Sequence, residues 1–286
     1  MHLCTRTPAR FVVRDGINNS LTSCVALLAA LFLVSCSGPR VEMLDRPVAQ
    51  SKAARALTNS TALDAGTRTV LRKEDLLGLY RKDPAGAIRE LATRHRQEPS
   101  EARRLALAEV CSDQADRLTA QNPSAALGYY LETASLTEEA AVAGAWQVEG
   151  SADRTLYAYS AVRVARLIHA HPEIPIKSAV VPGALRDWKL SLAEGKGAVN
   201  PRGYDLMAPA SWLKTKGIKW KPVKQDGFGA AMVGYREATP ERRAVDPMMP
   251  PAGRGTPLNA SIRFSGDEAS FVLQDLMASA SATVLG

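Results

Sequence analysis

Cys36 is the residue whose chemistry the sequence singles out most clearly. It follows an apolar stretch of ten residues, Val25 to Val34, by two positions. Ten residues are too few to cross the ~30 Å hydrocarbon core of a bilayer as a helix, which takes roughly twenty. Arg6, Arg10 and Arg14 precede the stretch. A basic region followed by a short apolar run is typical of a secretory signal peptide, so a nucleophilic thiol stands near its cleavage end.

The segment Leu33-Val34-Ser35-Cys36 resembles the bacterial lipobox. The resemblance implies that the Cys36 thiol receives a diacylglycerol, that the signal peptide 1–35 is removed, and that the protein is held on a membrane by its acyl chains. Ser37 rather than aspartate follows Cys36, which by the same resemblance favours the outer membrane, facing the periplasm or the cell surface. Two alternatives are a cleaved signal peptide without lipid and a buried cysteine in a short core helix. Ser37-Gly38-Pro39 stops any helix and disfavours the second alternative.

The cysteines fit an exported protein without an internal disulfide. Cys4 and Cys24 lie in the predicted signal peptide, and Cys36 is assigned to lipid. Cys111 is then the single remaining thiol, and it stands in an apolar helical pattern. We therefore predict a core cysteine at this position.

Motifs for catalysis, cofactors or metals are not found in the sequence. It contains no G-x-S-x-G, H-E-x-x-H or G-x-x-x-x-G-K segment, and no paired carboxylates stand out as an acid/base couple. The mature part has three histidines: His95 on an apolar helical stripe, and His169 and His171 at a predicted helix end. Two histidines two residues apart do not share a helix face, so we predict no metal site, no cofactor and no catalytic residue in this chain.

The charge balance is mildly basic, with a formal net charge of +7 over 286 residues. The dense basic run lies between residues 214 and 224 and consists of Lys214, Lys216, Lys219, Lys221 and Lys224. Trp212 and Trp220 interleave with it, which leaves a nucleic-acid or lipid-headgroup surface as an alternative. A solvated strand face with buried tryptophans is the favoured interpretation, so we predict no nucleic-acid partner.

Composition and periodicity divide the chain into four parts. After the signal peptide 1–35, residues 36–66 form a predicted flexible tether rich in Ala, Ser, Thr and Arg. Residues 67–172 show helical periodicity and form a predicted helical lobe. Residues 173–286 are rich in glycine, proline and β-branched residues and form a predicted β-rich lobe, which we interpret as truncated. Within it, Leu258 to Phe264 and Ser270 to Leu276 are predicted to form a hairpin around Ser265-Gly266-Asp267.

The helical lobe contains a short motif that occurs twice. Asp83-Pro84 and Asn122-Pro123 stand 39 residues apart, and each pair combines a good N-cap with proline at the first helical position. An apolar stripe at helical spacing follows each pair, with Leu107, Val110 and Cys111 between them. The period is close to that of tetratricopeptide-like (TPR-like) repeats. The predicted fold class is therefore α+β, with a TPR-like helical-hairpin lobe followed by a mainly antiparallel β lobe.

Several segments of the second half resemble one group of bacterial proteins. They are Leu156 to Ala161, Gly227 to Tyr235, and Pro250 to Gly253 leading into Leu258-Asn259-Ala260. They are similar to the N-terminal region of long lipoproteins in which such a region precedes an α/β-hydrolase domain. The hydrolase domain itself, with its nucleophile, acid and histidine, has no counterpart in this chain, so the resemblance carries over no catalytic residue.

The sequence thus favours a membrane-anchored lipoprotein of the bacterial cell envelope that is a non-catalytic accessory region of an α/β-hydrolase-type protein. The alternative is an independent envelope lipoprotein that binds a peptide or protein partner through its helical hairpins. A third interpretation is an enzyme with an unfamiliar site, for which a deep pocket with converging polar groups would be the sign.

Overall fold

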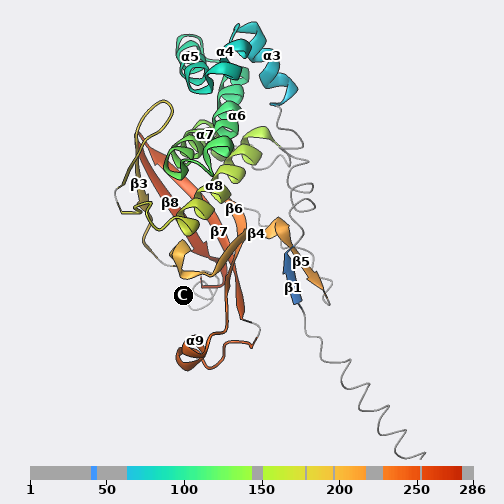
Figure 1. Ribbon diagram of the computed structural model, residues 1–286, viewed down its shortest axis with the longest axis vertical. Coiled ribbons are helices and arrows are strands. Elements are labelled where there is room, and N and C mark those ends of the chain that lie inside the picture. The colour runs from blue at the N-terminus through green and yellow to red at the C-terminus, as the bar shows by residue number, and fades with distance from the viewer. Residues whose placement is uncertain are drawn as a thin grey trace, which may run out of the picture. The chain divides into compact units, whose positions relative to one another are not determined.

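A computed structural model describes residues 40–43, 63–143, 151–177, 179–195, 197–216, 228–251 and 253–278. The predicted signal peptide, Cys36 and most of the predicted tether lie outside these residues. In the described part the main helices come first and the main strands follow, so the predicted α+β class is confirmed (Figure 1). None of the described helices is both long enough and apolar enough to span a bilayer.

The N-terminal half of the described chain is built from a succession of helices. They are α3 (Ala65–Lys73), α4 (Leu77–Lys82), α5 (Pro84–Gln97), α6 (Glu101–Leu118), α7 (Pro123–Ala143) and α8 (Ala152–Ala170). The two predicted caps are both present. Asp83 Oδ1 accepts a hydrogen bond of 2.9 Å from the Gly86 amide at the start of α5, and Asn122 Oδ1 accepts one of 3.0 Å from the Ala125 amide at the start of α7. The repeated motif therefore marks the starts of two helices, α5 and α7.

The apolar stripes of these helices meet in the core, as predicted from their spacing. The buried residues of the α5, α6 and α7 stripes include Ile88, Leu91, Leu107, Val110, Cys111, Leu127 and Leu131. On α8 a stripe with the same helical spacing is likewise buried and consists of Tyr157, Ala161, Val164 and Ile168. The helices and the sheet described next share one continuous hydrophobic core.

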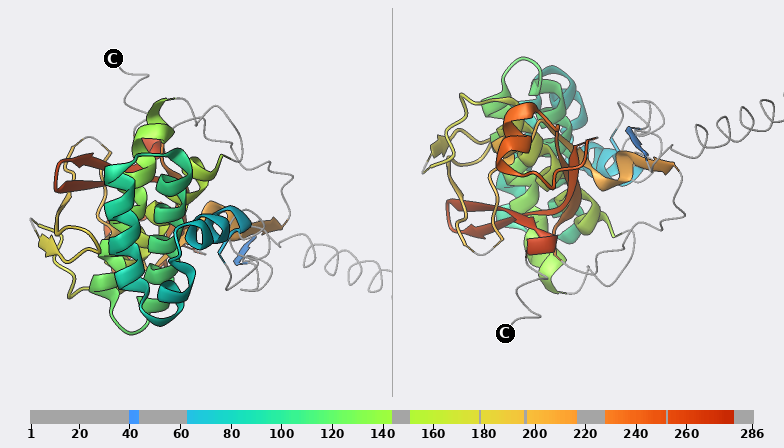
Figure 2. Two further views of the ribbon diagram at one scale, coloured as in Figure 1. Left: turned by 90° about the horizontal axis from the view of Figure 1, so that it is seen from above. Right: turned by 90° about the horizontal axis from the view of Figure 1, so that it is seen from below.

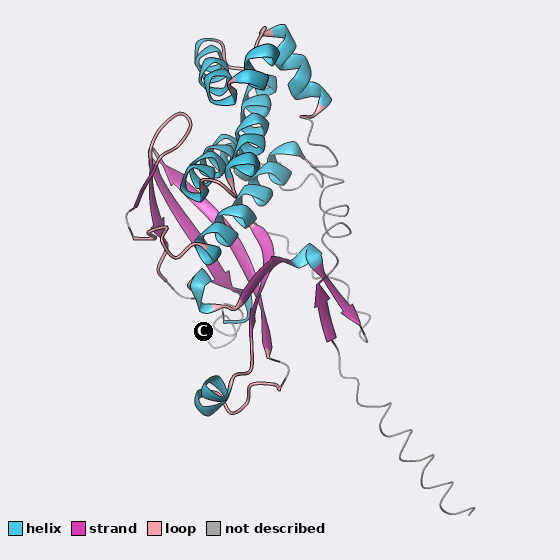
Figure 3. Ribbon diagram, in the orientation of Figure 1, coloured by secondary structure: helices cyan, strands magenta, loops and turns pink. Residues whose placement is uncertain are grey.

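The C-terminal half forms a mixed, mostly antiparallel six-stranded sheet (Figure 3). Its strands are β2 (Ala179–Val181), β3 (Trp188–Leu192), β4 (Leu206–Pro209), β6 (Ala230–Arg236), β7 (Arg254–Ser265) and β8 (Glu268–Asp275). They lie in the order β2-β3-β8-β7-β6-β4, in which β3 and β8 are parallel and the other neighbours antiparallel. Helix α8 packs on β4, β6 and β7, and α7 packs on β2 and β7.

The predicted hairpin is confirmed as β7 and β8. Ser265 pairs with Glu268, which leaves Gly266 and Asp267 as a two-residue turn. Gly266 has φ of +61°, a backbone conformation that glycine adopts without steric cost and that two-residue hairpin turns require. Short connecting elements complete the β-rich half, namely η2 (Pro201–Gly203), η3 (Ala210–Trp212) and α9 (Pro240–Val245).

A second, small unit consists of a two-stranded sheet. Strand β1 (Arg40–Met43) pairs with β5 (Leu213–Lys216). Lys214 and Lys216 of the basic run lie on β5, whereas the other three lysines of the run and Trp220 lie outside the described residues. Trp212, in η3, lies half-buried beneath the guanidinium of Arg166, whose carbon is 4.6 Å from the ring centroid.

Candidate functional site

The two histidines at the end of α8 make contacts that stabilise the fold. His169 Nε2 lies 3.0 Å from the carbonyl oxygen of Tyr204, and His171 Nδ1 lies 2.8 Å from Glu173 Oε1. Each therefore has a polar partner that is neither a hydroxyl nor a thiol. In the part of the chain that the structure describes, no group of three or more His, Cys, Asp or Glu side chains is arranged to hold a metal ion.

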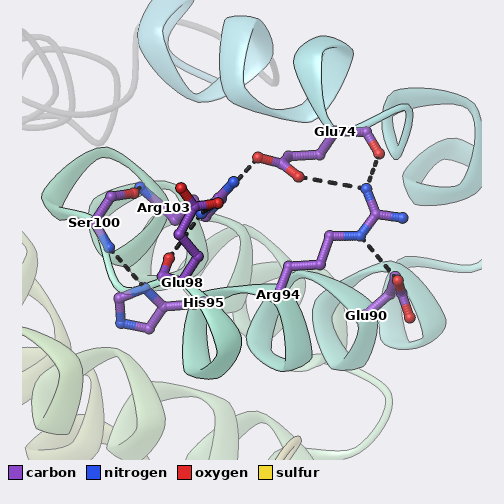
Figure 4. A network of polar contacts seen from close by, with 7 residues as sticks. All are labelled: Glu74, Glu90, Arg94, His95, Glu98, Ser100 and Arg103. Carbon is purple, nitrogen blue, oxygen red and sulfur yellow. Dashed lines mark hydrogen bonds and ion pairs between the residues drawn. The ribbon is translucent and has the colours of Figure 1, made fainter.

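The third histidine belongs to a network where the end of α3 meets α5 and α6 (Figure 4). Glu74 lies at its centre, with Oε1 2.7 Å from Arg103 Nε and Oε2 3.4 Å from Arg94 Nη1. The hydrogen bond from Arg103 lowers the pKa of Glu74. His95 Nδ1 accepts a long hydrogen bond of 3.5 Å from the Ser100 amide, and burial lowers the pKa of His95. This network links the end of α3 to α5 and α6, and both oxygens of its central carboxylate, Glu74, lie close to an arginine.

Cys111 is a core cysteine, as predicted. Its side chain is fully buried on α6. Burial raises the pKa of the thiol well above its ordinary value, and the neighbouring Glu132 raises it further. A thiol that stays protonated and inaccessible is not a nucleophile at neutral pH.

Glu132 is the most unusual ionisable residue of the described chain, and no sequence pattern singles it out. It lies on α7 with 0% of its surface exposed, and neither carboxylate oxygen has a hydrogen-bond partner. The nearest cation is Arg186, whose Nη2 lies 3.8 Å from Glu132 Oε1. The indole of Trp188 faces the same carboxyl, but its N–H also lacks a hydrogen bond. Burial raises the pKa of Glu132, and Arg186 and the indole N–H of Trp188 only partly oppose this.

The segment that covers Glu132 is pressed closely onto α7. A Cβ atom on Gly128 would lie 2.0 Å from the carbonyl oxygen of Pro182, so only glycine fits at this position of α7. A Cβ atom on Gly183 would lie 2.2 Å from the carbonyl oxygen of Arg186. Gly128 thus allows the connection between β2 and β3, residues 182–187, to approach the helix at backbone distance, and Gly183 allows the connection to turn tightly on itself.

A different kind of feature lies in the connection between β6 and β7, residues 237–253, which includes α9 (Figures 1 and 2). It presents two apolar side chains to solvent, Val245 with 88% and Met248 with 83% of its surface exposed. Among the described side chains of the helices α3 to α8, by contrast, the most exposed large hydrophobic residue is Leu79, at 39%. The exposed apolar surface is therefore concentrated in the β-rich half.

Polar contacts brace this β6–β7 connection. Asp205 accepts hydrogen bonds from the guanidinium of Arg242, with 2.9 Å between Nη2 and Oδ1, and from the Glu237 amide at 2.7 Å. Chiefly through Arg242, these bonds lower the pKa of Asp205 to about 2. Asp246 Oδ1 accepts a hydrogen bond of 3.2 Å from the Met248 amide, and Asp246 Oδ2 lies 3.2 Å from Arg254 Nη1.

The far end of the connection is equally constrained. Gly253 has φ of +81°, and a Cβ atom there would lie 2.5 Å from both the Arg236 carbonyl oxygen and the Tyr235 hydroxyl. Met249 turns inward and is buried, next to the exposed Met248. The connection therefore holds its two apolar residues in a defined position, which reduces the entropy that a binding partner would have to remove.

The described residues thus offer two notable features: two exposed apolar side chains in a segment held by ion pairs, and a buried carboxyl. Comparison of the chain with protein-family models, with curated proteins and with solved protein structures finds no match.

Proposed function

We propose that this chain is a lipoprotein of the bacterial cell envelope, anchored by lipid on Cys36, and that its folded part is a non-catalytic accessory region of an α/β-hydrolase-type protein. The β6–β7 connection is the contact surface for the hydrolase domain. The chain holds or regulates that domain at the membrane and performs no chemistry of its own. The outer membrane, facing the periplasm or the surface, is the proposed location.

The observation that carries the proposal is the exposure of Val245 and Met248 in a segment that ion pairs hold in place. Exposed apolar side chains that gather on one surface mark interaction sites, and methionine is enriched in interfaces. The alternative, recognition of a peptide through the helical hairpins, has less support because the exposed apolar residues lie elsewhere.

The anchor is tested by metabolic labelling. The full chain, expressed in a diderm bacterium with radiolabelled palmitate, should incorporate label and fractionate with membranes. Cys36→Ala should abolish the labelling and release the protein. Equal labelling of the two proteins would refute the lipoprotein part of the proposal without touching the accessory role.

The accessory role is tested with a hydrolase domain encoded downstream of residue 286 or in an adjacent gene. Mixing the two purified proteins should raise the melting temperature of the hydrolase domain or change its ester turnover. The double variant V245D/M248D should lose this effect. Val180→Asp is the matched control, since Val180 is 64% exposed on the edge strand β2, away from the connection.

An unchanged hydrolase domain, or equal loss with the control variant, would refute the accessory role. A fluorophosphonate probe, which labels activated serines, addresses the enzyme interpretation. We expect it to leave the chain unmodified. Labelling of one serine that disappears on heat denaturation would replace the proposal by an enzymatic one.

A further inference from the structure

We propose that the protonation state of Glu132 controls strand β2 and the connection that follows it, residues 179–187: this segment closes over a neutral Glu132 and opens when the carboxyl loses its proton. The inference does not depend on the proposed function. It rests on an uncompensated carboxyl beneath a segment that contacts α7 at backbone distance.

The first step is the burial of two polar groups without hydrogen bonds. Glu132 and Trp188 are both at 0% exposure, and neither the carboxylate oxygens nor the indole N–H makes a well-formed hydrogen bond. The indole N–H faces the carboxyl and opposes the rise of its pKa only in part. Burying an ionised carboxylate without hydrogen bonds costs far more than burying a neutral one. The closed arrangement therefore favours the protonated acid.

The second step is the set of charges around the carboxyl. From α6, Cys111 contributes a thiol that is itself kept neutral by burial. From the 182–187 connection, Arg186 contributes the one cation that acts on Glu132 among the described residues. Its side chain is 48% exposed and 3.8 Å away, so water screens much of its attraction. The loss of hydration on burial therefore outweighs the attraction of Arg186.

The third step identifies the part that moves. Strand β2 has three residues and lies at the edge of the sheet, paired only with β3 among the described strands. Opening of β2 and the connection would hydrate Glu132 while the β3–β8 and β7–β8 pairings stay in place. Trp188, at the first position of β3, would be exposed together with the carboxyl.

The direction of the pH dependence follows from linkage. The closed state raises the pKa of Glu132, whereas the open state returns it toward its ordinary value of 4.5. The closed state thus binds the proton more tightly, and opening becomes more favourable as the pH rises between these two pKa values. Each unit by which the pKa is raised corresponds to about a tenfold change in the open-to-closed ratio.

The test is hydrogen exchange, measured by mass spectrometry on the full chain between pH 5 and pH 9. Rates are divided by the intrinsic exchange rate at each pH. Protection of a peptide covering residues 180–187 should fall in the wild type as the pH rises, because the open state holds the Glu132 proton less tightly than the closed state. Protection of the β7–β8 hairpin serves as the internal reference and should stay constant.

Two variants and one control make the test specific. Glu132→Gln keeps the neutral shape and should remove most of the pH dependence. Arg186→Ala should enlarge the fall and extend it to higher pH, because it removes the group that opposes the pKa rise. Glu139→Gln, at an exposed position of the same helix, should behave like the wild type.

The proposal is overturned if Glu132→Gln shows the wild-type fall, or if the β7–β8 peptide changes in parallel. Should Glu132→Gln lose its far-UV circular dichroism, Arg186→Ala decides the matter. A smaller fall in Arg186→Ala than in the wild type would contradict the proposed balance between burial and attraction.

Discussion

Tyr157 forms hydrogen bonds between α8 and the sheet, and the cost in stability of removing them can be calculated from the structure. Its hydroxyl donates to the carbonyl oxygen of Ile262 at 2.7 Å and accepts from the Ile262 amide at 2.8 Å. Ile262 lies two residues beyond Ala260, the last residue of β7 that β6 pairs with. A single side chain on α8 thus satisfies the backbone groups that β6 leaves without a neighbour.

Tyr157→Phe removes this oxygen and leaves the ring in place. The ring contact with Phe228, at 4.6 Å between centroids, should persist. Both the tyrosine and Ile262 have 0% of their surface exposed, so water does not replace the lost partner in the unrelaxed structure. Each buried backbone group left without a hydrogen bond costs about 1–3 kcal/mol. With partial relaxation, we expect a loss of about 2–4 kcal/mol in the free energy of unfolding.

The measurement is urea unfolding of the full chain, followed by circular dichroism, with Tyr129→Phe as the control. Tyr129 is also buried on the helical side, and its hydroxyl makes no hydrogen bond to the described residues. The control should cost less than about 0.5 kcal/mol. Exchange of the Ile262 amide should accelerate in Tyr157→Phe alone. A loss below about 0.5 kcal/mol, or one equal to the control, would refute the argument that the hydroxyl completes the sheet.

Three further outcomes follow from the core, a helix contact and an ion pair. Leu131→Ala should cost about 2–5 kcal/mol in urea unfolding because the leucine is fully buried, and a loss below about 0.5 kcal/mol would mean that the helical phase is wrong. Gly128→Ala should lower the melting temperature through its backbone clash, whereas Gly78→Ala, with open space around it on α4, should leave it unchanged or raise it. Arg242→Ala should return the pKa of Asp205, measured by NMR titration, from about 2 toward 3.8. Because the folded-state pKa is depressed, the Asp205 contribution to stability is present above pH ~4 and lost as the pH falls through about 2.

The elements that follow from short-range chemistry could be predicted. Asp83 with Pro84 and Asn122 with Pro123 specify helix starts because their caps lie within three residues. The apolar stripes on α5 to α8 specify a buried face because helical spacing is a local property. Gly266 specifies the β7–β8 turn for the same reason. The α+β class follows from these elements together.

The features that define the candidate sites could not be predicted, because they depend on partners distant in the sequence. Glu132 stands in a stretch of α7 that would suit either an exposed or a buried position. Its significance comes from Trp188 and Arg186, more than fifty residues away. The same holds for Asp205, which precedes β4 and accepts a hydrogen bond from Arg242 in the β6–β7 connection. Spacing within a helix carries no information about contacts of this kind.

The parallel pairing of β3 with β8 determines the order in which the sheet can be completed during synthesis. Strand β8 is made after every other described strand, yet it lies between β3 and β7 in the interior of the sheet. The helices can pack as soon as they are made, because their neighbours are close in the sequence. The β2–β3 hairpin has no strand to join until residues 268–275 exist. For a chain that crosses a membrane N-terminus first, the sheet would assemble only at the end of export. Such long-range pairing predicts slow folding for the β-rich half.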